Sequence, residues 1–197
     1  MVARRHYTSA PVSARRLWIL VCAFALAVGL GACGQVSQPV SSENDGVYVD
    51  AGPVTYQLQV SRQLNQYAVE DHQYLAGLPA GEARLTAGEL WYGVFLWAKN
   101  QTNGFHPTSD NFTITDTNGN TFHPIQLDSA VNGYAWTSQT LAPFAIEPAP
   151  NTTASFGPTQ GGLILFRLPI TVYSNRPLTL HIYPPGGEHP ASISLDF

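Results

Sequence analysis

Prolines and glycines interrupt this 197-residue chain at short intervals along its whole length. There are 15 Pro and 17 Gly, and both residues disfavour the interior of a long helix. A coiled coil is therefore excluded, and no long amphipathic helix is expected. The segments between the interruptions are short and apolar, as strands are. The chain is expected to be an all-β protein.

The spacing of the apolar residues predicts where the strands lie. Residues 54–60 alternate between apolar and polar, as in a strand with one buried face, and residues 90–98 are apolar on both faces, as in a central strand. Asn118-Gly119 between two alternating segments predicts a hairpin. About seven strands separated by turns predict an antiparallel β-sandwich. The expected strands are 54–60, 90–98, 112–115, 121–125, 162–168, 178–183 and 192–197, with long loops at 68–89 and 127–160.

The N-terminal segment has the features of an export signal. Arginines at positions 4, 5, 15 and 16 precede an uncharged apolar run, Leu17 to Leu30, which is short for a transmembrane helix and fits a signal peptide. Leu30-Gly31-Ala32-Cys33 then resembles the bacterial lipobox, which implies that Cys33 is acylated and becomes the new N-terminus. Residues 1–32 are thus predicted to be a lipoprotein signal peptide. An ordinary secretory signal or an uncleaved anchor is the alternative, and the export route, general or twin-arginine, stays open.

The expected mature chain is acidic and contains a single thiol. The 9 Lys and Arg face 13 Asp and Glu, and four of the basic residues lie in the expected signal peptide. A nucleic-acid-binding role is disfavoured because no basic stripe follows residue 16. Cys22 would leave with the signal peptide, so Cys33 would have no partner for a disulfide. Residues 33–52, rich in Ser, Asn, Pro and Gly, are predicted to be a lipidated flexible tether to a domain at 53–197.

The order of several short motifs resembles a known family. Leu96-Trp97-Ala98-Lys99-Asn100, the Asp116–Asn120 turn and a late strand ending Phe166-Arg167-Leu168-Pro169 are similar to those of the telokin-like, immunoglobulin-like domain of many bacterial lipoproteins. The resemblance spans about residues 54–183. It implies an immunoglobulin-like β-sandwich and an extracytoplasmic location, and it carries over no catalytic residue.

Residues that carry out chemistry do not form a recognisable motif. His72, His106 and His123 lack the spacing of a zinc site, and no nucleophile elbow is found. Glu70 and Asp71 directly precede His72 on a segment interpreted as a solvated loop. The turn at Asp116–Asn120 is interpreted as a hairpin turn, because it lacks the Gly and Glu positions of a calcium loop. No cofactor, no metal and no catalytic residue are predicted.

An aromatic, proline-rich segment is the candidate for ligand binding. Tyr134, Trp136 and Phe144 lie in it, and exposed aromatics in a loop are typical of recognition patches. The alternative, which is favoured, is that Trp136 and Phe144 plug one end of the sandwich, since aromatic side chains are mostly buried.

These observations lead to one functional hypothesis and two rivals. The chain is expected to be a non-catalytic, lipid-anchored binding or accessory module on the outer face of a bacterial cytoplasmic membrane, with a protein partner in the cell envelope. The first rival is a cell-envelope enzyme or metal-handling protein using His72, His106 or His123. The second is a module that binds cell-wall glycans through Tyr134 and Trp136. The oligomeric state and the ligand stay open.

Overall fold

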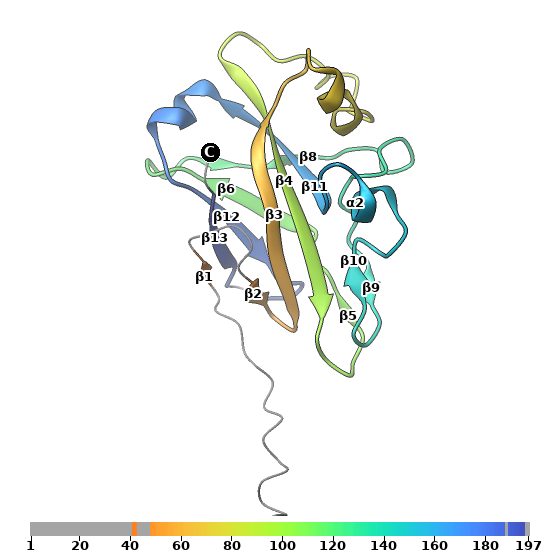
Figure 1. The fold of residues 1–197 in the computed structure, drawn as a ribbon. Helices are drawn as coiled ribbons and strands as arrows, with labels where there is room; N and C mark the ends of the chain where they lie inside the picture. The colour runs from red at the N-terminus through yellow and green to blue at the C-terminus, as the bar shows by residue number, and fades with distance from the viewer. Residues whose placement is uncertain (1–40, 43–47, 188, 196–197) are drawn as a thin grey trace, which may run out of the picture. The chain divides into compact units, whose positions relative to one another are not determined.

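The fold is built from two β-sheets packed face to face (Figure 1). The computed structural model describes residues 41–42, 48–187 and 189–195, so the expected signal peptide and Cys33 lie outside the described residues. The first sheet has the order β2-β3-β4-β11-β8. Its strands are β2 (Tyr48–Ala51), β3 (Val54–Leu64), β4 (Glu89–Asn100), β11 (Gly162–Pro169) and β8 (Pro124–Ile125), and β10 (Ile146–Glu147) pairs with β4 beyond the end of β11.

The second sheet has the order β1-β13-β12-β6-β7. Its strands are β1 (Ser41–Ser42), β13 (Ala191–Leu195), β12 (Leu178–Tyr183), β6 (Asn111–Thr115) and β7 (Thr121–Phe122). Every ladder in both sheets is antiparallel except that between β1 and β13. The smaller elements are a ribbon of β5 (His106–Pro107) and β9 (Thr140–Leu141), the short helices η2 (Val69–Tyr74) and η3 (Ile170–Ser174), and α2 (Thr153–Phe156).

The strand connections have immunoglobulin topology. The path β3-β4-β11-β8 corresponds to the ABED sheet of a constant-type domain, and β6-β12-β13 corresponds to the CFG sheet. The expectation of an all-β, immunoglobulin-like antiparallel sandwich is therefore confirmed. No cysteine occurs within the described ranges, so packing has to stabilise this part of the sandwich without an inter-sheet disulfide.

The first sheet is buried on both faces, as the apolar run at 90–98 predicts. Leu90, Tyr92 and the following even-numbered residues of β4 pack between the sheets. Trp91 and Phe95 point the other way, into a second apolar layer covered by the β3–β4 connection and by α2. Because successive side chains of a strand alternate between faces, a strand with two apolar sets needs two covering layers. The β3–β4 connection, residues 65–88, supplies much of the second one.

The Asp116–Asn120 turn forms the predicted hairpin connection. The Asp116 carboxylate accepts the backbone N–H groups of Asn118 and Asn120, both at 2.9 Å, and the side-chain amides of Asn120 and Asn175. These N–H donors, led by the Asn120 amide, lower the pKa of Asp116. Gly119 takes the positive φ of 82° that the turn requires. The carboxylate thus organises the turn through N–H donors.

The sandwich begins before residue 53, where the domain was predicted to start. Val49 and Ala51 of β2 are buried in the core, and β2 pairs with β3 through a turn at Gly52 and Pro53. The prediction of a tether over 33–52 overlooked this strand, because four residues are too few to show an alternating pattern.

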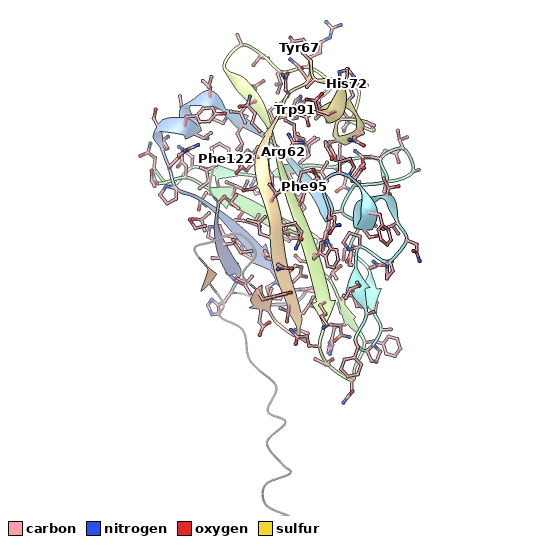
Figure 2. The ribbon with its side chains drawn as sticks, in the orientation of Figure 1. Arg62, Tyr67, His72, Trp91, Phe95 and Phe122 are labelled. Carbon is pink, nitrogen blue, oxygen red and sulfur yellow. The ribbon has the colours of Figure 1, made fainter. Side chains whose placement is uncertain are left out.

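The acidic segment Glu70-Asp71-His72 is not a solvated loop. It belongs to η2, and Asp71 is buried. Its carboxylate lies 2.6 Å from the Arg62 guanidinium and accepts the Asn65 N–H at 2.8 Å. Burial raises the pKa of Asp71, but the Arg62 hydrogen bond and the Asn65 N–H outweigh burial and lower it overall. The interaction between Asp71 and Arg62 fixes η2 over the second apolar layer. Figure 2 shows Tyr67 and His72 at the end of the sandwich that carries η2.

Within the described residues, no helix has the length and apolarity needed to span a membrane.

Candidate functional site

The predicted aromatic segment is built into the edge of the first sheet. Ala135 forms a parallel bridge with Leu163 of β11. The Trp136 N–H donates to the Leu163 carbonyl at 2.9 Å, and the Leu163 N–H donates to the Tyr134 carbonyl at 2.6 Å. The Tyr134 side chain packs in the second apolar layer, whereas the Trp136 side chain packs in the core between the sheets. This short segment therefore departs from a regular strand, in which residues two apart share a face.

Trp136 is fixed at the end of the inter-sheet core. Its indole Nε1–H donates to the Ser109 carbonyl at 2.8 Å. The ring packs on Tyr56 and, edge-on, on Phe112, with centroid distances of 6.1 and 5.6 Å. Gly162 makes room for the indole, since a Cβ at that position would lie 2.7 Å from Trp136 Cε3. The position of the indole is therefore set by contacts on several sides.

Two cavities border Trp136. One has a volume of about 140 Å³ and is lined by Asp110, Gln126 and Ser138 among others. The other has a volume of about 230 Å³ and is lined by Gln139, Glu147 and Thr152 among others. Ala135, Trp136 and Thr137 line both. We call the second cavity the Glu147 cavity.

Glu147 supplies the carboxyl group of the Glu147 cavity. It lies on β10, opposite Ala98 of β4, and is only 5% exposed. Burial raises its pKa to about 7, although hydrogen bonds from the Thr108 and Gln139 side chains act in the opposite direction. The carboxyl oxygen Oε2 is buried and has no hydrogen-bond partner in the described part of the chain. Desolvation of the charged form without full compensation is the cause of the raised pKa.

The hydrogen bonds around Glu147 come from backbone segments far apart in the sequence. The Thr108 N–H donates to the Gln139 carbonyl at 2.9 Å, and the Gln139 N–H donates to the Thr108 hydroxyl at 3.0 Å. This reciprocal pair holds the Thr108 hydroxyl and the Gln139 backbone in place, and the side chains of both residues act on the Glu147 carboxyl. A carboxyl held in this way is part-protonated near neutral pH, so it can donate or accept a hydrogen bond and exchange a proton.

The three predicted ligand-binding residues do not form one exposed patch. Tyr134 and Trp136 are buried, and the Tyr134 ring packs edge-on against Tyr74 at 4.8 Å. Phe144 is 61% exposed and has a φ of 60°. The interpretation as a plug is therefore correct for Trp136 and wrong for Phe144.

Glu147 was missed by the sequence reasoning. The signal available was an acidic residue between apolar neighbours, in Ala145-Ile146-Glu147-Pro148. Such a residue is often exposed, and only the contacts made across the fold bury this one.

The three histidines of the rival hypothesis lie on different elements. His72 is on η2, His106 on β5, and His123 between β7 and β8. The His72 ring contacts the Gln66 carbonyl at 3.0 Å. Across the described ranges, no three His, Cys, Asp or Glu side chains are grouped so that they can hold a metal ion.

Comparisons with known proteins find similarity in structure only. No family model and no curated protein matches the sequence. The yjhA protein of Bacillus subtilis is similar with a TM-score of 0.49 and 11% identity, covering 78% of this chain and 99% of that one. An uncharacterized β-sandwich protein of Clostridium difficile 630 is similar with a TM-score of 0.43 and 12% identity, covering 83% of this chain and 99% of that one. The "putative lipoprotein" ycdA of Bacillus subtilis is similar with a TM-score of 0.44 and 11% identity, covering 79% of this chain and 39% of that one. Similarity at this level assigns no function and no residue role to the chain.

Proposed function

We propose that this chain is a non-catalytic, lipid-anchored module of the bacterial cell envelope that binds a ligand or a partner protein through its Glu147 cavity. The observation that carries the proposal is Glu147 itself. A buried carboxyl with a raised pKa and an unpartnered oxygen costs folding free energy. Titratable groups perturbed in this way are concentrated at functional sites.

The anchor is supported by the sequence. Leu30-Gly31-Ala32-Cys33 follows an apolar run of signal-peptide length. The immunoglobulin topology of the sandwich also agrees with the resemblance to the telokin-like domains of bacterial lipoproteins. Cys33 would carry the acyl chains, and the domain would act outside the cytoplasmic membrane.

The lining of the Glu147 cavity supports a ligand that donates hydrogen bonds. Thr137, Gln139 and Thr152 add polar side chains to the carboxyl, and Trp136 adds an apolar wall. A hydroxyl or amino group of a ligand would give Oε2 of Glu147 the donor that it lacks. Trp136 is only 8% exposed and its ring contacts Tyr56 and Phe112, which disfavours the stacking that a glycan-binding module would use.

The anchor is tested by mass spectrometry of the protein purified from membranes. The expected result is an N-terminal peptide that begins at Cys33 and carries the mass of the acyl chains, and its absence from a Cys33→Ser strain. An N-terminus at another residue, or an unmodified Cys33, would show that the lipobox interpretation is wrong.

The binding role is tested by crosslinking in intact cells, with wild type, Glu147→Gln and Glu70→Gln compared. Glu70 is an exposed carboxyl on η2, so its amide variant is the matched control. A partner or ligand crosslinked in wild type and Glu70→Gln but lost in Glu147→Gln supports the proposal. Equal capture by all three rules out the cavity as the binding site, and a turnover activity that Glu147→Gln abolishes identifies the chain as an enzyme.

A further inference from the structure

Two exposed phenylalanines lie together at one end of the sandwich. Phe105 is 70% exposed and Phe144 is 61% exposed. Phe105 immediately precedes β5, and Phe144 follows β9 by three positions; His106 of β5 pairs with Leu141 of β9. We call these two side chains and the loops that carry them, residues 101–105 and 142–145, the aromatic tip. In Figure 1 this tip lies at the lower end of the sandwich, near β5 and β9.

The tip is held rigidly by one buried side chain. The Asn100 amide is fully buried and donates to the carbonyls of Gly104 at 2.7 Å and Ala142 at 2.9 Å. Its Oδ1 accepts the Thr102 N–H at 2.9 Å. Both loops are therefore tied to the end of β4, and the phenyl rings are presented to solvent on an ordered backbone. A left-handed φ of 60° at a phenylalanine is unfavourable, and the exposed ring gains no core packing in return.

The chain enters the sandwich from this same end. Ser41 of β1 pairs in parallel with Ser192 of β13, one residue after β13 begins. The turn that precedes β13 approaches the β2–β3 turn, because a Cβ at Gly52 would lie 3.2 Å from the Pro184 Cβ. The β2–β3 turn in turn lies beside the end of β4, since Val54 pairs with Asn100. The first residues of β1 and the aromatic tip are thus at one end of the sandwich.

The length of chain before β1 is short. Eight peptide units separate Cys33 from Ser41, and they reach at most about 28 Å when fully extended. If Cys33 is acylated, as proposed above, the end of the sandwich that carries Ser41 stays within that distance of the lipid. The opposite end, which carries η2, lies about 40 Å from the aromatic tip, the length of the 12 residues of β4.

We propose that Phe105 and Phe144 insert into the interfacial region of the lipid leaflet that holds the Cys33 anchor. This inference rests on the lipid anchor of the proposed function and adds an orientation to it. Exposed aromatic rings gain free energy when they leave water for the headgroup and acyl boundary. The aromatic tip would act as a second contact with the membrane, and the domain would stand on the bilayer with the η2 end directed away from it.

The test measures membrane depth at single positions of the full lipoprotein in vesicles. The variants Phe105→Cys, Phe144→Cys and Tyr67→Cys each carry one fluorophore, because the mature protein would have no other free thiol. Tyr67 is 83% exposed at the η2 end and is the matched control. The vesicles contain a phospholipid with a nitroxide at the headgroup boundary. Quenching at positions 105 and 144 is expected to be roughly threefold or more that at position 67, because interfacial apolar groups lie about 5–10 Å inside the lipid.

The outcomes separate this inference from the anchor. If the protein floats with the vesicles but positions 105 and 144 are quenched no more than position 67, insertion of the tip is wrong and the anchor stands. If the tip is instead buried against a second copy of the chain, the fluorophores are shielded from aqueous iodide but not quenched by the lipid nitroxide, which also overturns the proposal. If the acylated protein does not float with vesicles, both the anchor and the insertion are wrong.

Discussion

Replacing Glu147 by glutamine is expected to stabilise the protein at alkaline pH and to leave its stability nearly unchanged at acid pH. The carboxyl has an ordinary pKa of 4.5 when the chain is unfolded and a pKa of about 7 when it is folded. Between these values the folded state binds the proton and the unfolded state does not, so stability falls as pH rises. Below about pH 4.5 the Glu147 carboxyl is protonated in both the folded and the unfolded state, and above about pH 7 the loss of folding stability is complete.

The size of this effect follows from the pKa difference. The difference between a pKa of 4.5 and a pKa of about 7, at about 1.4 kcal/mol for each tenfold change in proton affinity, amounts to about 3 kcal/mol. Glutamine does not titrate, so the stability advantage of Glu147→Gln over wild type should grow by about 3 kcal/mol between pH 4 and pH 8. Any loss of stability that the amide causes equally at both pH values cancels when the stability difference at pH 4 is subtracted from that at pH 8.

The assay is guanidinium unfolding of the purified protein at several pH values, followed by tryptophan fluorescence. Glu70→Gln, at an exposed position of η2, is the control, and it is expected to change stability by less than about 0.5 kcal/mol at either pH. Parallel stability profiles for Glu147→Gln and wild type would refute the reasoning, since they would mean that Glu147 is solvated in the folded protein.

Three further substitutions test the packing around the site and the tip. Gly162→Ala places a Cβ against the Trp136 indole and is expected to cost about 1–3 kcal/mol in guanidinium unfolding; an unchanged midpoint would contradict the close packing. Asp71→Asn removes the charge that pairs with Arg62 and should cost about 1–3 kcal/mol at pH 7. The loss of stability should shrink at low pH. Because the pKa of Asp71 is lowered on folding, its ionised form stabilises the folded protein, and this stabilisation disappears as pH falls and the carboxylate is protonated. Phe144→Asn should raise stability by about 0.5–1 kcal/mol in thermal unfolding, since asparagine tolerates positive φ.

The parts of the fold that could be predicted are those determined by local pattern. Residues 90–98 showed two apolar faces, and β4 is buried on both. The Asn118-Gly119 pair marked the β6–β7 connection. In that turn the Asp116 carboxylate accepts the Asn118 N–H, and Gly119 takes the positive φ. In both cases the residues that carry the information are neighbours in the sequence.

The parts that could not be predicted depend on contacts between distant residues. Asp71 looks like a solvated acid until the fold brings Arg62 to it. Glu147 is buried only because β10 pairs with β4 and because Thr108 and Gln139 meet beside it. Burial of a single polar residue leaves no periodic trace in the sequence, so the candidate site could be located only in the folded structure.

The hydrogen bonds of Asn100 have a consequence for the dynamics of the molecule. One amide group joins backbone carbonyls from two loops that are about forty positions apart in the chain. Neither loop can detach without leaving a buried polar group unpaired, so the two are expected to open as one cooperative unit. Amide hydrogens of the non-proline residues in 102–108 and 139–145 should therefore exchange with solvent at a common opening free energy, higher than that of an ordinary surface loop.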